Sequence, residues 1–143
     1  MSSGKTSSAV GIRLDHLLAA VGVSPPRTPP TAWPEVTGVA CDSRRVQPGD
    51  LFVAIVGERF DGRRFVPAAL EAGAVAVLGP PPADEAAPRW VPWIAVDEPR
   101  SILGALSARA FGRPGDALRL VGFTGTNGKS TLVHLLGSVL DAA

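Results

Sequence analysis

A glycine-rich turn between an apolar run and a helical pattern constrains this chain more than any other feature. The turn reads Thr124-Gly125-Thr126-Asn127-Gly128-Lys129-Ser130-Thr131 and follows the apolar run 118–123. A strand, a glycine-rich turn and a helix in this order predict a parallel α/β unit. The N–H groups at the start of such a helix point outward, and the helix dipole places partial positive charge there. The pattern therefore predicts a phosphate site.

The residue types of the turn indicate which phosphate ligand it would take. Gly125 and Gly128 let the backbone come close to phosphate oxygens, and Lys129 supplies a positive charge for the β- and γ-phosphates. The Ser130 hydroxyl, with Thr131 beside it, stands where a magnesium ligand is needed. The strict spacing would require a glycine where Phe123 stands, so the alternative is a turn that uses glycine for geometry alone. The complete pattern favours a nucleoside triphosphate with Mg²⁺.

Composition excludes several other classes of protein. The chain has 143 residues, 45% of them hydrophobic, and a formal net charge of +1. Such a balance argues against a nucleic-acid partner bound through phosphate neutralisation. No apolar run is long enough to span a bilayer, and the first residues lack the apolar region of a signal peptide. With one cysteine no internal disulfide can form. We expect a cytoplasmic protein without membrane insertion.

Strand and helix patterns alternate along the chain, which predicts an α/β fold. The apolar run 51–56 predicts a strand that is buried on both faces. We expect a disordered tail at 1–10, a compact first domain at 11–97, a connecting helix and linker at 98–115 and an incomplete second domain at 116–143. The expected strands are 36–41, 51–56, 74–78, 93–96 and 118–123, and the expected helices are 12–21, 65–72, 99–111 and the one after the turn.

The turn and its strand, 118–131, resemble the ATP loop of the Mur ligases, which add amino acids to the peptidoglycan precursor. A second stretch, Asp42-Ser43-Arg44-Arg45-Val46-Gln47-Pro48-Gly49-Asp50-Leu51-Phe52-Val53-Ala54, is similar to the first-domain signature of that family, and 57–65 and 69–77 continue it. The resemblance implies a small UDP-binding domain, followed by the first strand, phosphate loop and helix of a Rossmann-like ATPase domain.

Within the family the chain is more similar to the tripeptide-forming ligases than to the pentapeptide-forming ones. The helix end 110–115 and Thr126 favour the former, whereas 57–62 is rather like the latter. Folylpolyglutamate synthetases share a similar loop but usually carry an extra glycine after the lysine, which this chain lacks. A pentapeptide-forming ligase and a stand-alone nucleotide-sugar-binding module without catalysis remain the alternatives.

The resemblance implies that the first domain holds the UDP end of UDP-N-acetylmuramoyl-dipeptide. By matching positions, Cys41 and Ser43 would lie beside the uridine. Glu58, Arg59 and Phe60 would form a second uridine-contacting loop. Ser43 can donate and accept hydrogen bonds, and Phe60 can offer a ring face to the base. The alternative interpretations are a turn shaped around Ser43 and a small core residue at Cys41.

Two arginine pairs lie near these positions, and guanidinium groups match the geometry of phosphate oxygens. The pairs are Arg44 with Arg45 and Arg63 with Arg64. They could therefore favour a diphosphate. Neighbouring arginines also commonly form a solvated face, and that alternative stays open for each of the four.

The family reaction implied by the resemblance is ATP-dependent amide formation through an acyl phosphate, with an amino acid as the second substrate. Lys129 would steady the γ-phosphate and Ser130 would coordinate Mg²⁺. Further magnesium ligands, a modified lysine and the domain for the amino acid occur later in family members, and the parent enzyme would be monomeric. We therefore expect an amino-terminal fragment that does not ligate alone. Its apolar residues after the loop would be exposed: Leu132, Leu135, Leu136 and Leu140.

Overall fold

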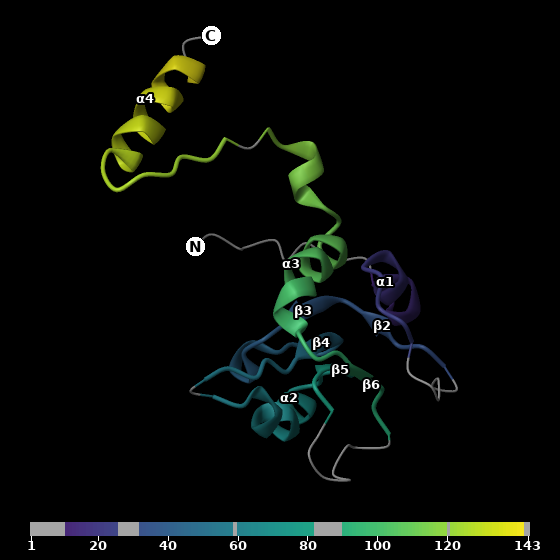
Figure 1. Ribbon diagram of the computed structural model, residues 1–143. Coiled ribbons are helices and arrows are strands. Elements are labelled where there is room, and N and C mark those ends of the chain that lie inside the picture. Colours follow the sequence, from purple (N-terminus) through teal and green to yellow (C-terminus); the bar gives the residue numbers. More distant parts are fainter. Residues whose placement is uncertain (1–10, 26–31, 59, 82–89, 120, 142–143) are drawn as a thin grey trace, which may run out of the picture.

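Parallel strands form the central sheet of the protein, seen in a computed structural model (Figure 1) that describes residues 11–25, 32–58, 60–81, 90–119 and 121–141. The predicted tail 1–10 lies outside these residues. In the sheet the strands follow their order in the chain, and the register pairs Val39 with Leu51, Phe52 with Val77 and Leu78 with Ile94. The strands are β3 (Gly38–Ala40), β4 (Asp50–Val53), β5 (Ala76–Gly79) and β6 (Trp93–Ala95).

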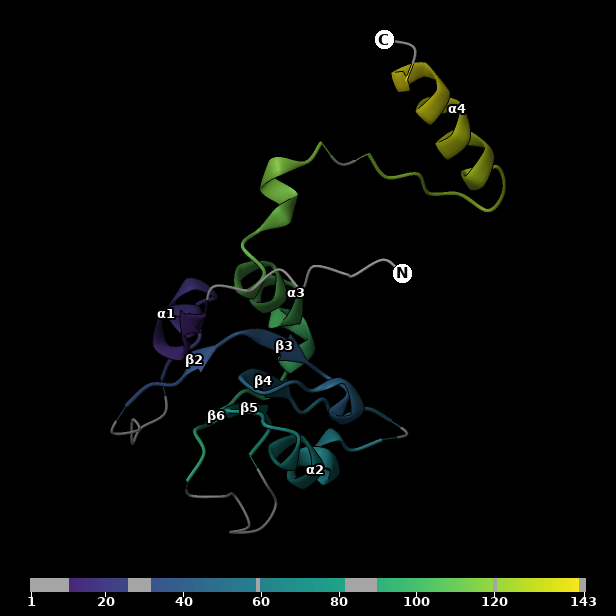
Figure 2. The same cartoon turned by 180° about the vertical axis from the view of Figure 1, so that it is seen from behind.

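Helices cover both faces of this sheet, as Figures 1 and 2 show. Helix α1 (Leu14–Ala20) and helix α3 (Pro99–Ala110) lie on one face, and α2 (Val66–Glu71) lies on the other. A proline lies in the first turn of α2, where its missing N–H costs nothing. Gly73 ends the helix with a φ of 104°, a conformation that residues with a side chain rarely adopt.

The core has two layers, separated by the sheet. Leu51 and Val53 of β4 point toward α1 and α3, whereas Phe52 and Ala54 point toward α2. All four are buried, because successive side chains of a strand face opposite sides and helices cover both. The α/β fold is therefore confirmed. Burial on both faces is confirmed for 51–54, whereas the expected strand 51–56 is too long, because β4 ends at Val53 and Val56 is 44% exposed.

The expected strand 36–41 is divided between two sheets. Strand β2 (Glu35–Val36) pairs antiparallel with β1 (Ile12–Arg13), and the chain joins the central sheet only at β3. Thr37 separates the two strands, and its N–H donates to the carbonyl of Gly49 at 3.0 Å. The antiparallel pair adjoins α1, because the N–H of Leu14 donates to the carbonyl of Pro34 at 3.0 Å.

Helix α3 contributes directly to the core of the α/β unit. Leu106 and Ala110 are buried, and Leu106 packs in the same layer as Leu14, Leu17 and Leu18. The expected helix 99–111 is thus confirmed as α3. The boundary of the first domain, expected at residue 97, remains a prediction.

The expected strand 118–123 is wrong for the part that the structure describes. Residues 118–119 and 121–123 are irregular, and Leu118 and Val121 are 61% and 65% exposed. A strand needs a neighbour for its hydrogen bonds, and none of the described residues pairs with this stretch.

Helix α4 (Lys129–Asp141) follows the glycine-rich turn and stands apart from the sheet in Figure 1. The predicted exposure is confirmed for Leu132, Leu135 and Leu140, whereas Leu136 is partly buried. Across the described ranges, no helix combines the length and apolar character required to cross a membrane.

Candidate functional site

An open hollow of about 590 Å³ lies at the carboxyl ends of β3 and β4. Open parallel sheets bind ligands at this edge, because the loops that leave the strands there are free to carry polar groups. Two separate parts of the chain form its wall, the segment after β3 and the segment between β4 and α2. The lining residues are Cys41, Asp42, Ser43, Arg44, Phe60 and Phe65.

This hollow brings together three of the residues that the sequence singled out for a uridine. Cys41 and Ser43 line it from one side and Phe60 from the other. Glu58 is exposed and is not among the lining residues, and Arg59 lies outside the described residues. Phe60 is 72% exposed, so its ring is open to a ligand. Cys41 is exposed, and its interpretation as a small core residue is wrong.

Asp42, which sequence reasoning did not single out, shapes the wall on the β3 side. It precedes the short 3-10 helix Ser43–Arg45, and its Oδ1 accepts from the backbone N–H of Arg44 at 3.0 Å. The Arg44 guanidinium donates to both carboxylate oxygens, at 3.0 and 2.7 Å. These side-chain hydrogen bonds, with the backbone one, lower the pKa of Asp42 to about 2. The turn is thus shaped by Asp42, and Ser43 is left free to face the hollow.

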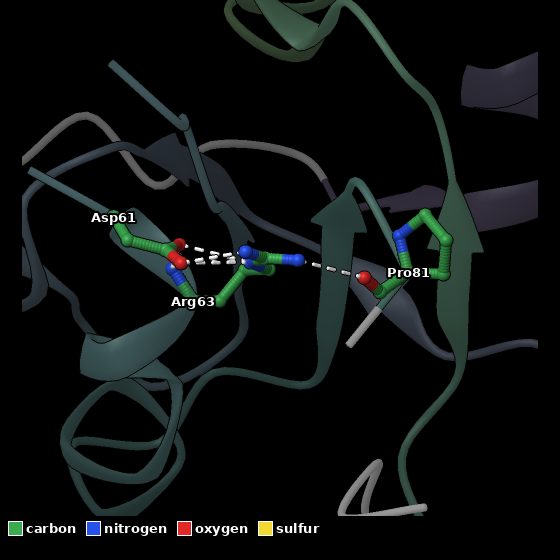
Figure 3. Close-up of polar contacts among 3 residues, drawn as sticks. All are labelled: Asp61, Arg63 and Pro81. Atoms are coloured by element: carbon green, nitrogen blue, oxygen red, sulfur yellow. Dashed lines mark hydrogen bonds and ion pairs between the residues drawn. The ribbon is translucent and has the colours of Figure 1, made fainter. Parts of the chain in front are cut away.

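The same arrangement recurs on the other side of the hollow. Asp61 precedes the 3-10 helix Gly62–Phe65 and accepts from the backbone N–H and the guanidinium of Arg63 (Figure 3). The hydrogen bonds from the Arg63 side chain lower the pKa of the Asp61 carboxyl. An Asp-x-Arg pattern at 42–44 and again at 61–63 was the signal in the sequence that could have predicted both pairs.

The paired arginines differ in how far they are open to a ligand. The Arg44 side chain is 86% exposed and borders the hollow, whereas the Arg63 side chain is 29% exposed and does not line it. Arg45 lines a neighbouring hollow of about 540 Å³, which shares Cys41 and Asp42 with the first and runs along the edge strand β3 to Phe111. Of the four arginines, Arg44 and Arg45 are therefore the two placed beside these hollows.

Two glycines of the glycine-rich turn adopt backbone conformations that residues with a side chain rarely take. Gly125 and Gly128 have φ values of 152° and 78°. Helix α4 begins at Lys129, so Ser130 and Thr131 lie in its first turn, and these residues are exposed. The Lys129 ammonium donates to the carbonyl of Gly125 and thereby closes the turn on itself.

The donor set near the turn fits a magnesium ion that arrives with a nucleotide. Among the described residues no group of three or more His, Cys, Asp or Glu side chains could hold a metal ion. Magnesium bound to a nucleotide takes most of its ligands from phosphate oxygens and water, with one or two from the protein. The Ser130 hydroxyl supplies one oxygen of the required kind.

An α/β unit with an open hollow at the carboxyl ends of its strands, followed by a glycine-rich loop and a helix, is typical of nucleotide-binding proteins. The family described as "Mur ligase family, catalytic domain" matches residues 35–111, which include the sheet and α3. The chain belongs to the Mur ligase family.

Two curated relatives carry the name UDP-N-acetylmuramoyl-L-alanyl-D-glutamate–2,6-diaminopimelate ligase. The protein of Solibacter usitatus is 46% identical over 92% of this chain and 26% of its own length. The protein of Chlorobaculum tepidum is 45% identical over 94% of this chain and 27% of its own length. The chain thus spans about a quarter of the length of these relatives.

A solved structure of MurF from Acinetobacter baumannii is similar to this chain with a TM-score of 0.67 and 28% identity. The similarity covers 94% of this chain and 28% of that one. The described arrangement of sheet, helices and loop is therefore one that the family uses.

Proposed function

We propose that this chain is the UDP-substrate-binding part, together with the ATP loop, of a ligase that adds an amino acid to UDP-N-acetylmuramoyl-L-Ala-D-Glu. One observation carries the proposal. Cys41, Ser43 and Phe60, singled out in two separate stretches of sequence, line one hollow. The names of the relatives support the same substrate, and the protein would act in peptidoglycan precursor synthesis in the cytoplasm.

The uridine end of the substrate would occupy this hollow. A uracil ring presents hydrogen-bonding groups at its edge and an apolar face. The Ser43 hydroxyl can donate to or accept from the edge, and the Phe60 ring can cover the face. Arg44 borders the hollow and is largely exposed, so it would meet the diphosphate while it remains paired with Asp42. A guanidinium can do both because it has five N–H donors.

The glycine-rich turn would hold the ATP phosphates. The N–H groups of Gly128 and Lys129 would face the phosphate oxygens, and the Lys129 ammonium would leave the Gly125 carbonyl for the γ-phosphate. When bound, Mg²⁺ neutralises phosphate charge, and Ser130 with Thr131 would hold and orient it. The reaction would pass the γ-phosphoryl group to the free carboxylate of the muramoyl dipeptide. The amine of the amino acid would then attack the acyl carbon, and inorganic phosphate would leave.

A test of this proposal must separate it from two other functions. A pentapeptide-forming ligase is favoured by the likeness to MurF, whereas the names of the relatives favour the tripeptide-forming ligase. A stand-alone nucleotide-sugar-binding module would use the hollow alone. Calorimetric titration with UDP-N-acetylmuramoyl-L-Ala-D-Glu, with the corresponding tripeptide and with ATP tests all three.

If the proposal is right, the chain binds the dipeptide substrate and, in a separate titration, ATP with Mg²⁺. A preference for the tripeptide substrate would favour the pentapeptide-forming reaction. Binding of the UDP compounds without ATP would favour the stand-alone module. Failure to bind any UDP compound would refute the proposal.

A further inference from the structure

We infer that Arg63 is a positioning residue, which sets the place of Phe60 in the uridine hollow through Asp61 rather than by contact with the ligand. The inference rests on the proposed function, because it assigns Arg63 a role in the same substrate site. It separates Arg63 from Arg44, although both follow an aspartate by two residues.

Arg63 and Asp61 are joined along one edge of the guanidinium, which meets both carboxylate oxygens (Figure 3). The Arg63 Nε lies 2.9 and 3.0 Å from the two Asp61 oxygens, and Nη2 lies 2.7 Å from Oδ2. The backbone N–H of Arg63 adds a bond of 3.0 Å to Oδ1. Such a planar pair fixes orientation as well as distance.

A third partner attaches this pair to the sheet. The Arg63 Nη1 donates to the carbonyl of Pro81 at 3.1 Å, and Pro81 follows the end of β5. Figure 3 shows the guanidinium lying between Asp61 and Pro81, with its nitrogens directed at both. With 29% of its side chain exposed, Arg63 is committed to partners within the protein.

Asp61 lies at the base of the turn that carries Phe60. It forms an antiparallel bridge with Val56, and the N–H of Gly57 donates to the Phe60 carbonyl at 2.9 Å. Phe60 itself is mostly exposed, so its own packing contributes little to its position. Its ring is therefore held over the hollow by the base of the turn, which Arg63 connects to β5.

The substitution Arg63→Lys would keep the positive charge but would lose the connection between Asp61 and Pro81. A single ammonium cannot donate to both Asp61 oxygens and to Pro81 in one plane. The matched control is Arg64→Lys, because Arg64 is the adjacent exposed arginine and no hydrogen bond or ion pair of its side chain occurs among the described residues.

The experiment measures the affinity of the chain for uridine and for UDP by ligand-observed NMR titration. For Arg63→Lys we expect the affinity for both ligands to fall by the same factor, about tenfold, because a displaced Phe60 affects the base. For Arg64→Lys we expect no change. A loss for UDP that is absent for uridine would overturn the inference, since it would indicate direct contact with the diphosphate.

A double-mutant cycle tests the route through Phe60. In a Phe60→Ala background, Arg63→Lys should reduce UDP affinity less than twofold. A full tenfold loss in that background would overturn the inference. Asp61→Asn, which leaves the Pro81 bond possible, should reproduce the effect of Arg63→Lys, and thermal melts show that each variant is folded at the temperature of the titration.

Different results would refute the proposed function and the role of Arg63. If the unmodified chain binds neither uridine nor UDP, the proposed function is refuted and the role of Arg63 falls with it. If the unmodified chain binds both and Arg63→Lys binds them equally well, only the role of Arg63 is refuted.

Discussion

Gly62 is the position where adding one methyl group should disturb both the stability of the fold and the hollow. A Cβ at Gly62 would lie 2.5 Å from the carbonyl oxygen and 2.7 Å from the backbone nitrogen of Ile55. Both are backbone atoms two residues after the end of β4, so neither can rotate away. The two segments must separate by at least about 0.5 Å, which strains the 2.9 Å hydrogen bond from the Gly62 N–H to the Ile55 carbonyl.

We expect Gly62→Ala to lower the free energy of unfolding by about 1–3 kcal/mol, the usual cost of forcing an extra methyl group into a packed site. The matched control is Gly104→Ala in α3, where an added Cβ meets nothing within 4 Å. This control should raise the free energy of unfolding by about 0.5–1 kcal/mol, because alanine favours a helix over glycine.

Urea unfolding followed by tryptophan fluorescence measures both variants. UDP affinity measured under native conditions should also fall for Gly62→Ala, because Gly62 adjoins Asp61 at the base of the Phe60 turn, and should be unchanged for Gly104→Ala. Equal stability of Gly62→Ala and the unmodified chain would contradict this close approach, since it would mean that the segment after Asp61 is not held against Ile55.

Three further predictions address the core, the wall of the hollow and the phosphate loop. Leu106→Ala should destabilise the protein by about 2–5 kcal/mol in urea, because Leu106 is fully buried in the core layer that α1 shares, and a loss below about 1 kcal/mol would contradict its place there. The ionised Asp42 carboxylate should contribute its full stabilisation above about pH 3.8 and lose it as the pH falls toward about 2, since its pKa is lowered from 3.8; an NMR titration of Asp42 with a midpoint near 3.8 would contradict this. Lys129→Ala should abolish ATP binding in calorimetry and leave UDP affinity unchanged, and a parallel loss of both would show that the two sites are not separate.

The central strands and the longer helices could be predicted from the sequence because their signals are local. The apolar run of β4, the glycine after α2 and the apolar spacing of α3 each identify an element without knowledge of its neighbours. The pair β1 and β2 could not be found in this way. Two-residue strands carry no periodic pattern, and their pairing joins Ile12 to Val36 across the chain.

Strands β1 and β2 were not predicted but are present, whereas the stretch 118–123 was predicted as a strand and none is seen among its described residues. Its apolar pattern is nevertheless strong. Apolar residues indicate what a segment can bury, but a strand also needs a partner for its backbone. Its described residues remain irregular and largely exposed. Residues 118–123 therefore mark a limit of prediction from local pattern alone.

Half of the candidate site was visible in the sequence and half was not. The resemblance pointed to Cys41, Ser43 and Phe60, which line one hollow. The aspartates that shape its two sides were missed, because their partners are the arginines that were considered as diphosphate ligands. Each pair forms across a backbone turn that the aspartate itself stabilises, so the repeated Asp-x-Arg spacing could have indicated it, whereas composition could not.

The place of the uridine can be tested most directly through Cys41, which is the one cysteine of the sequence and lines the hollow. The measurement is the rate at which a thiol reagent modifies Cys41, with and without saturating UDP, and with ATP as the control. We predict that UDP slows the reaction several-fold and that ATP does not. An unchanged rate at saturating UDP would contradict the assignment of this hollow to the uridine.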